Sequence, residues 1–377
     1  MYFPTNKSFI LNKDRIKNNK KYTVVQIIDR LNAGGAEKVL VNLSNILHRK
    51  GHSVSVLTTV EKGPLSGFLD KDITIINLER KWKWNPLTMY FFIKKIRHFD
   101  IIHVHSSYNL RYLFLASRIF MLRKPIFFHE HFGDINIDQH ISWHTKYIYP
   151  KTIMIAVSRQ IAEWAINKVH IAEKRVFVLP NTVVKENIKS NSFKSRQVIK
   201  LLVVSNLRPT KNIIAAIQVL EALLLQKNNF HLTIIGQIAD TLYYKKIKEY
   251  IKEKHLESYT HIQTNCTNIQ AIAHEYDLAL HTATSESGPL VLIEYIAQGL
   301  PFISYNTGEV VQQIKNDLPE FIMPSFHIEE WVKQVHLILT MDQYSLQKKM
   351  QETFDRYYSV EAYYETCMEI YAEGLQL

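Results

Sequence analysis

Cysteine is nearly missing from this chain of 377 residues, which contains only Cys266 and Cys367. Two cysteines exclude the disulfide framework of a small secreted domain and fit a reducing compartment. Long hydrophobic runs are missing too, since no apolar stretch approaches the roughly 18 residues of a membrane span. The apolar stretch near the N-terminus is too short for a signal peptide. We therefore expect a cytoplasmic protein whose residues 1–20 form a flexible lead-in.

Glycine is also scarce, with 11 residues in the whole chain, below the usual share of about 7%. Because glycine lacks a Cβ atom, the few glycines present are expected where the backbone needs an unusual conformation or a close approach. Four of them fall at expected helix ends: Gly34, Gly35, Gly288 and Gly299.

Acidic residues are few in the first half of the chain. Residues 1–200 carry 33 lysines and arginines against 14 aspartates and glutamates, and the net charge of the chain is +11. Such a half can face an anionic membrane, a phosphate-bearing substrate or nucleic acid. A lysine-rich solvated surface explains the charge equally well. The motifs and aromatic platforms of nucleic-acid binders are not evident, so we expect no nucleic-acid partner.

What the chain does have is 46% hydrophobic residues, enough for two ordinary cores. Short β-branched or aromatic runs recur at intervals that leave room for a helix, which is the rhythm of a parallel sheet. The runs are 23–28, 54–58, 74–77, 100–105, 125–131, 152–157 and 176–180, then 199–205, 231–236, 277–282 and 301–305. The polar stretch 185–198 separates the two groups. We predict two doubly wound α/β domains with ligands bound beyond the carboxyl ends of their strands.

Two loops after expected strands carry signals for anion binding. Gly34-Gly35 opens an amphipathic helix whose free N–H groups would attract phosphate or sugar oxygens, although a tight strand-to-helix turn explains two glycines as well. In VVSNLRPTKN, Arg208 and Lys211 precede a second helix. Cations are poor partners for a helix N-terminus, so their placement favours an anion bound there.

A third loop begins the stretch SESGPLVLIEYIAQGLP, residues 285–301. Pro289 suits the first helical turn and Gly299 should end the helix. Glu294 then lies about one turn into the helix and Glu286 lies before it, so the two carboxylates flank the helix N-terminus. Helix capping by Glu286 is the simpler alternative. The apolar surroundings of Glu294 nevertheless require a partner, which a hydroxyl-rich ligand would provide.

Histidines cluster on two expected strands, in DIIHVHSS and FFHEHFGD. Strand alternation places His103 with His105 and His129 with His131 on one face each. With Glu130 nearby they could in principle bind zinc, but no HExxH motif or further spaced carboxylate completes such a site. We expect hydrogen-bonding histidines and no metal.

Taken together in this order and spacing, these loops resemble the retaining glycosyltransferases of family 4, which have the GT-B fold. The resemblance runs from about residue 22 to 374 and is carried by AGGAEKVLVNLSNILHRKGHSVSVLT, NLRPTKN and SESGPLVLIEYIAQGLPFISYNTGE. It implies two Rossmann-like domains that face a central cleft. The acceptor-binding domain would be 21–190, the nucleotide-sugar donor-binding domain 191–357, and the C-terminal helix 358–377 would pack back on the first domain.

The resemblance also implies a role for each matching residue. Glu286 would hydrogen-bond hydroxyls of the donor sugar, Glu294 would bind the ribose, and Lys211 would neutralise the diphosphate. His131 would lie over the reacting sugar. The remaining donor-binding positions contribute mostly backbone groups: Gly34, Gly35, Gly288, Pro289 and Leu290. Asn181 matches an asparagine that precedes the interdomain linker.

One departure from the family pattern concerns Asn206, which stands where many members have an arginine. Arg208, two residues further on, would supply the guanidinium instead. With Lys211 and the helix start after Gly288, it would meet the charge that develops on the leaving diphosphate. The resemblance therefore implies a retaining transferase without a divalent metal or a cofactor, whose only co-substrate is a nucleotide-diphosphate sugar. The acceptor would be a glycan or a lipid-linked sugar in cell-surface polysaccharide synthesis.

Segment 79–100, ERKWKWNPLTMYFFIKKIRHFD, interleaves aromatic and basic side chains in a way that suits an anionic membrane surface. They are Trp82, Trp84, Phe91 and Phe92 with Lys81, Lys83, Lys94, Lys95 and Arg97. An ordinary helix with half its aromatics in the core explains the pattern equally well. The first interpretation makes the protein a peripheral one on the inner face of the cell membrane.

Three other functions fit parts of the sequence. A nucleotide-sugar epimerase would share the two-domain shape and would need no acceptor. A non-enzymatic module that binds membranes or nucleic acid would rely on the basic half alone and would show strongly salt-dependent binding. A zinc hydrolase that uses the histidines fits least well.

Overall fold

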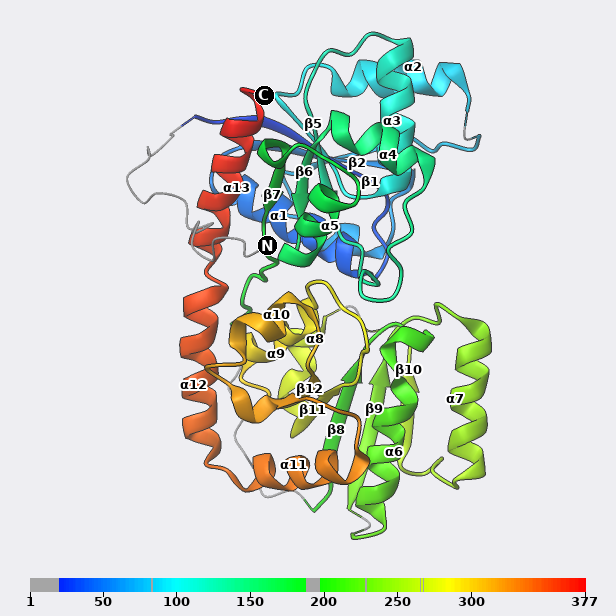
Figure 1. Cartoon of the computed structure of the whole chain (residues 1–377), viewed down its shortest axis with the longest axis vertical. Coiled ribbons are helices and arrows are strands. Elements are labelled where there is room, and N and C mark those ends of the chain that lie inside the picture. Colours follow the sequence, from blue (N-terminus) through cyan, green and yellow to red (C-terminus); the bar gives the residue numbers. More distant parts are fainter. Residues whose placement is uncertain (1–19, 83, 188–196, 228, 265, 267) are drawn as a thin grey trace.

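The computed structural model describes residues 20–377 apart from 83, 188–196, 228, 265 and 267. Two domains lie one above the other, each a parallel sheet with helices on both faces (Figure 1). The prediction of two doubly wound α/β domains is confirmed. The predicted lead-in at 1–20, except for its last residue, and most of the separating stretch 185–198 lie outside the described residues.

The first sheet has the order β3-β2-β1-β4-β5-β6-β7 and the second β10-β9-β8-β11-β12-β13. The first seven strands are β1 Thr23–Arg30, β2 Ser53–Glu61, β3 Thr74–Asn77, β4 Ile101–Val104, β5 Ile126–Glu130, β6 Ile153–Ala156 and β7 Val176–Val178. The others are β8 Ile199–Val204, β9 Phe230–Ile235, β10 Thr260–Gln263, β11 Leu278–His281, β12 Phe302–Tyr305 and β13 Ile322–Met323. Every predicted strand is present. β10 and β13 were missed because the first is half polar and the second is very short.

Strand β1 shows why these runs fold as buried parallel strands. Val25 and Ile27 pack into one hydrophobic cluster, whereas Val24 and Ile28 pack into the cluster on the opposite face. Alternate side chains of a strand point to opposite faces, so a strand covered on both sides is apolar at most positions; the buried Gln26 is the exception in β1, and it bonds to His105. The spacing of the apolar runs in the sequence therefore indicates a sheet that is covered by helices on both faces.

Helices cover both sheets. In the first half they are α1 Gly35–Arg49, α2 Pro86–Ile96, α3 Ser107–Ile119, α4 Trp143–Ile148 and α5 Arg159–Asn167. In the second half they are α6 Ile213–Leu224, α7 Thr241–Glu253, α8 Ile269–Ile272, α9 Leu290–Gln298, α10 Gly308–Ile314, α11 Ile328–Thr340, α12 Gln343–Tyr357 and α13 Val360–Gly374. One face of the first sheet is covered by α2, α3 and α5 and the other by α1 and α13.

The chain returns to the first domain at its C-terminal end. Phe354 of α12 packs in the core of the second domain, whereas Tyr371 of α13 packs beneath the first sheet. Figure 1 shows α12 alongside the lower domain and α13 alongside the upper one. At the crossing, the hydroxyl of Thr182 donates a hydrogen bond of 2.7 Å to the carbonyl oxygen of Tyr358. The last helix therefore ties the two domains together.

Segment 79–100 divides its aromatic residues between core and solvent. Phe92 is fully buried on α2, while Phe91 is 46% exposed. Trp82 and Trp84, in the loop before the helix, are 78% and 54% exposed. The neighbouring Lys83 lies outside the described residues. Within the part of the chain that the structure describes, no helix is both long enough and apolar enough to cross a bilayer.

Candidate active site

A cleft of about 280 Å³ lies between the two domains, at the carboxyl ends of both sheets. The strand order reverses between β1 and β4 in the first sheet and between β8 and β11 in the second. Such switch points are where open α/β sheets bind ligands. All eleven residues to which the sequence assigns a site role line this cleft: Gly34, Gly35, His131, Asn206, Arg208, Lys211, Glu286, Gly288, Pro289, Leu290 and Glu294.

Two helix N-termini open into the cleft. Helix α1 begins after Gly34 and helix α9 begins after Pro289, and neither start has a side-chain cap. Their first backbone N–H groups have no helical acceptor, so each end carries a partial positive charge that favours an anion. The predicted end of α9 is confirmed, since Gly299 ends the helix with φ of 66° in the left-handed region, whereas Pro289 is the N-cap and lies just before the first turn. The alternative in which Glu286 caps α9 is wrong.

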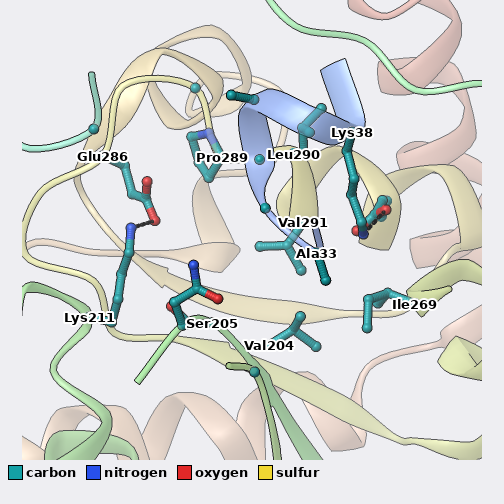
Figure 2. A pocket seen from close by; sticks show the side chains of 18 of the residues that line it. Ala33, Lys38, Val204, Ser205, Lys211, Ile269, Glu286, Pro289, Leu290 and Val291 are labelled. Atoms are coloured by element: carbon teal, nitrogen blue, oxygen red, sulfur yellow. Dashed lines mark hydrogen bonds and ion pairs between the residues drawn. The ribbon is translucent and has the colours of Figure 1, made fainter. Parts of the chain in front are cut away.

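Lys211 and Glu286 form the central ion pair of the cleft, with 2.5 Å between Nζ and Oε1 (Figure 2). Both side chains are mostly buried, at 9% and 12% exposure. His281 Nε2 lies 3.6 Å from the same carboxylate oxygen. Burial lowers the pKa of His281 to about 4, although the nearby carboxylate of Glu286 opposes this shift. The imidazole is therefore neutral at pH 7, and Lys211 supplies the positive charge.

Lys38 is a cleft residue that the sequence reasoning missed. Its Nζ atom contacts Glu294 Oε1 at 2.8 Å, which joins helix α1 of the first domain to helix α9 of the second (Figure 2). The partner expected for the buried Glu294 was a hydroxyl-rich ligand, whereas the structure provides this lysine. A signal existed, because Lys38 follows Gly34 by four residues and so lies one helical turn deeper on the same face.

Further contacts hold the domains together around the cleft. Arg208 Nη1 donates to Asp134 Oδ2 of the first domain at 2.7 Å. Asn181 Nδ2 donates to the carbonyl oxygen of Gly288 at 2.7 Å. A Cβ atom at Gly288 would lie 2.9 Å from that same Nδ2 atom, so the glycine permits the close approach of the first domain. Arg208 thus points into the cleft with its charge already paired.

The four histidines lie in contact with one another, with His103, His105 and His129 buried and His131 at the cleft wall. His131 Nε2 lies 3.1 Å from His105 Nδ1, and His105 Nε2 lies 2.6 Å from Gln26 Oε1. Burial lowers the pKa of His131 to about 3 and the pKa of His105 well below its ordinary value. All are neutral at pH 7. With Gln26 Oε1 as acceptor, His105 carries its proton on Nε2, so His131 Nε2 donates to His105 Nδ1.

A metal ion could contact three of these rings on geometry alone, since His103, His105 and His129 place nitrogens within 4.8 Å of one another. His105, however, uses both ring nitrogens in hydrogen bonds. Glu130 is also engaged elsewhere, by Tyr149 Oη and by the backbone N–H groups of two residues that follow it. The carboxylate that a zinc hydrolase needs as a general base is therefore not available in this cluster.

Glu37 in the first turn of α1 carries the most perturbed carboxyl near the cleft. Burial and the nearby Asp29 raise its pKa from 4.5 to about 7. A raised pKa means that the folded protein binds the proton more tightly than the unfolded chain, so this stabilisation is present below about pH 4.5 and is lost as the pH rises through about 7.

Glu37→Gln should therefore raise the melting temperature at pH 8 and leave it unchanged at pH 4. A change of about 1 kcal/mol corresponds to about 2–4 °C in a domain of about 150–250 residues. Thermal unfolding at both pH values measures the effect, and Glu257→Gln, at an exposed position, serves as the control. A stabilisation of Glu37→Gln that is equal at pH 4 and pH 8 would contradict the raised pKa.

Comparisons with known proteins agree with this geometry. The family model for glycosyl transferases group 1 matches residues 184–356, and the model for glycosyltransferase family 4 matches residues 33–186. Among curated proteins, the phosphatidylinositol N-acetylglucosaminyltransferase gpi3 subunit of Schizosaccharomyces pombe is 24% identical over 313 residues, which cover 77% of this chain and 67% of that protein.

Solved structures show the same fold. Anabaena HepE in complex with UDP and glucose superimposes with a TM-score of 0.77 at 16% identity, covering 93% of this chain and 99% of that one. A Staphylococcus aureus TarM mutant gives a TM-score of 0.77 at 13% identity, with the same two coverages. The two-domain cleft is thus that of the GT-B fold. The chain belongs to glycosyltransferase family 4 and is a glycosyltransferase.

Proposed function

We propose that the protein is a retaining, metal-independent transferase that moves a sugar from a nucleotide-diphosphate sugar to a glycan or lipid-linked acceptor during the synthesis of a cell-surface polysaccharide. One observation carries the proposal: two ion pairs, Lys211–Glu286 and Lys38–Glu294, lie between two uncapped helix N-termini in a single cleft. Cations and helix ends suit a diphosphate, while carboxylates suit sugar hydroxyls.

Each residue then has a distinct task. The diphosphate lies against the helix starts after Gly34-Gly35 and Gly288, where Pro289 and Leu290 lead into α9. Lys211 and Arg208 neutralise it, and the amide of Asn206 lies beside it. Glu286 holds the sugar, and Glu294 binds the ribose once the ribose hydroxyls replace Lys38. The ammonium of Lys38 is thereby freed to turn towards the phosphates.

The chemistry needs no nucleophile from the protein. The bond between the anomeric carbon and the diphosphate oxygen breaks while fixed cations stabilise the negative charge that develops. The acceptor hydroxyl attacks from the same face and gives its proton to a diphosphate oxygen, so the configuration is retained. His131, neutral at pH 7, lies beside the reacting sugar. The TarM structure contains UDP with α-GlcNAc-glycerol, and HepE contains UDP with glucose, which supports a nucleotide-sugar donor.

The cations and helix ends of the cleft provide the positive charge that a metal ion supplies in other transferases. The sequence has one Asp-x-Asp triplet, Asp70-Lys71-Asp72, but these residues do not line the cleft, and Asp70 pairs with Arg49 at 2.8 Å. At the cell membrane, the exposed Trp82 and Trp84 and the basic first domain would meet the inner, anionic face. A cytoplasmic, peripheral location follows from this proposal.

Incubating the protein with a panel of nucleotide sugars tests the proposal. A true donor should raise the melting temperature, since ligand at a hundred times its Kd adds about 2.7 kcal/mol to the free energy of unfolding. NMR of the product should show the anomeric configuration of the donor, and EDTA should leave the rate unchanged. An epimerised sugar formed from donor alone would identify an epimerase, and a panel without any stabilising nucleotide sugar would refute the transferase.

The tautomer of His131 gives a second test. Gln26→Leu removes the acceptor that fixes the proton of His105 on Nε2, and His131 then loses its fixed hydrogen-bond partner and orientation. We expect kcat to fall by roughly tenfold while the donor KM stays unchanged. Ser44→Ala, at another fully buried polar position of the same domain, controls for general packing. Equal kcat values for the two variants would show that the tautomer does not matter.

A further inference from the structure

Arg80 is a buried arginine that the donor site does not use. Its side chain is 6% exposed, and neither Nη1 nor Nη2 has a hydrogen-bond partner. Among the described residues, no carboxylate forms an ion pair with it. A buried charge without an acceptor is expensive, so proteins retain one mainly where a ligand or partner supplies the opposite charge.

Two aromatic rings fix the guanidinium in place. Its central carbon lies 4.8 Å from the centre of the Tyr108 ring and 4.3 Å from that of Tyr112. These contacts attract a cation through the ring faces, but they accept no conventional N–H hydrogen bond. The planar group is thereby held in one orientation while the donors on both terminal nitrogens stay unused, which is the form that binds a phosphate through paired hydrogen bonds.

The position of Arg80 places it on the cleft side of the first domain. It follows β3 at the carboxyl end of the sheet, and its backbone N–H donates to the carbonyl oxygen of Thr59 at 2.9 Å. Tyr108 belongs to the first turn of α3, which follows β4 at the same carboxyl end of the sheet. The cleft opens at this end of the sheet too, so Arg80 lies on the same side of the first domain as the cleft.

The residues that follow Arg80 in the chain are exposed at the surface. Lys81, Trp82, Trp84 and Asn85 line a surface hollow of about 500 Å³. Both tryptophans are largely exposed, so the hollow combines a cation with apolar rings. An acceptor that carries a phosphate next to an apolar or sugar moiety matches this combination.

We propose that Arg80 forms a phosphate-binding subsite for the acceptor, in which its two terminal nitrogens bind a phosphate ester while Trp82 and Trp84 contact the adjoining part of the acceptor. The inference rests on the proposed transferase function, because it specifies the class of acceptor. The phosphate belongs either to a lipid carrier or to a water-soluble phosphorylated glycan. Tyr108, the less buried of the two rings, has to rotate to admit it.

Binding of decyl phosphate, below its micelle-forming concentration, tests the subsite, with decyl β-maltoside as the neutral counterpart. Calorimetric titration should show that Arg80→Met weakens decyl phosphate binding at least tenfold. Arg123→Met removes an exposed arginine at the opposite, amino end of the same sheet and should leave the affinity for decyl phosphate unchanged. Arg80→Lys should retain part of that affinity. The proposal would be overturned if the wild type bound decyl phosphate and decyl β-maltoside with equal affinity. It would also be overturned if Arg80→Met bound decyl phosphate as tightly as the wild type does.

Inorganic phosphate separates the two sources. If inorganic phosphate binds as tightly as decyl phosphate, the acceptor is a soluble phosphorylated glycan. If decyl phosphate binds more tightly than inorganic phosphate, the acceptor is lipid-linked. Thermal unfolding separates the subsite from a purely structural role: Arg80→Met should keep or raise the melting temperature, because it removes a buried unpaired charge. A lower melting temperature with unchanged phosphate affinity would make Arg80 structural.

The donor reaction distinguishes failure of this subsite from failure of the transferase function. Hydrolysis of a nucleotide sugar without acceptor should proceed at the wild-type rate in Arg80→Met, because Arg80 does not line the donor cleft. If the wild type neither binds nor hydrolyses any nucleotide sugar, the transferase proposal fails, and with it the acceptor role of Arg80, whatever the result with decyl phosphate. If hydrolysis is normal and phosphate binding does not depend on Arg80, the subsite alone fails.

Discussion

Replacing Lys211 with methionine should lower the rate of sugar transfer by about a hundredfold or more. Fixed charges aimed at a developing negative charge typically contribute this much to a rate. Lys211 is held in place by Glu286 at 2.5 Å and by almost complete burial, so its ammonium does not have to be reorganised when the diphosphate leaves. Methionine keeps an unbranched apolar side chain that is one atom shorter, and it removes the charge and its hydrogen bonds.

Lys349→Met is the matched control. Lys349 pairs with Glu320 at 2.9 Å in the same domain but away from the cleft. The Lys349→Met variant should transfer sugar at the normal rate, while Lys211→Met should lose both transfer and affinity for the nucleoside diphosphate. Removing Lys211 also leaves a mostly buried carboxylate unpaired, at a cost on the order of 3 kcal/mol, so rates must be expressed per folded protein. A Lys211→Met protein that is folded and fully active would contradict the proposed neutralisation of the diphosphate.

Local signals explain why the helix that opens into the cleft could be predicted from the sequence. Pro289 and Gly299 mark the two ends of α9 because each has a backbone preference that does not depend on the rest of the fold. Glu286 and Glu294 then take their places relative to the helix start by geometry alone. Apolar runs likewise locate strands such as β1, since burial on both faces leaves few polar positions.

Side-chain partners that come from the other domain could not be predicted in this way. Lys38 and Glu294 lie 256 positions apart in the chain, and Arg208 and Asp134 lie 74 apart. Which charge meets which depends on how two separately folded sheets face each other, and neither helical nor strand periodicity carries that information. The predicted partner of Glu294, a ligand, was chosen because the sequence shows a buried carboxylate but not the lysine opposite it.

Replacing Glu286 with glutamine should also lower transfer by about a hundredfold, with little change in affinity for the nucleoside diphosphate. In the proposed arrangement the carboxylate accepts strong, charge-assisted hydrogen bonds from sugar hydroxyls, and an amide would form weaker ones. Glutamine also leaves the ammonium of Lys211 without its counter-charge, and His281, neutral because burial lowers its pKa to about 4, does not replace it. The sugar is then held loosely just where a misplacement on the order of 1 Å can reduce a rate a hundredfold.

The contrast between the two variants makes this prediction specific. Calorimetric titration with the nucleoside diphosphate should give near wild-type affinity for Glu286→Gln and weaker affinity for Lys211→Met, because in the proposed arrangement Lys211 contacts the phosphates and Glu286 contacts the sugar. Glu320→Gln, which changes the carboxylate of the control pair, should affect neither binding nor rate. If Glu286→Gln weakened binding of the nucleoside diphosphate as strongly as Lys211→Met does, the two residues would act as one phosphate-binding unit. The assignment of Glu286 to the sugar would then be wrong.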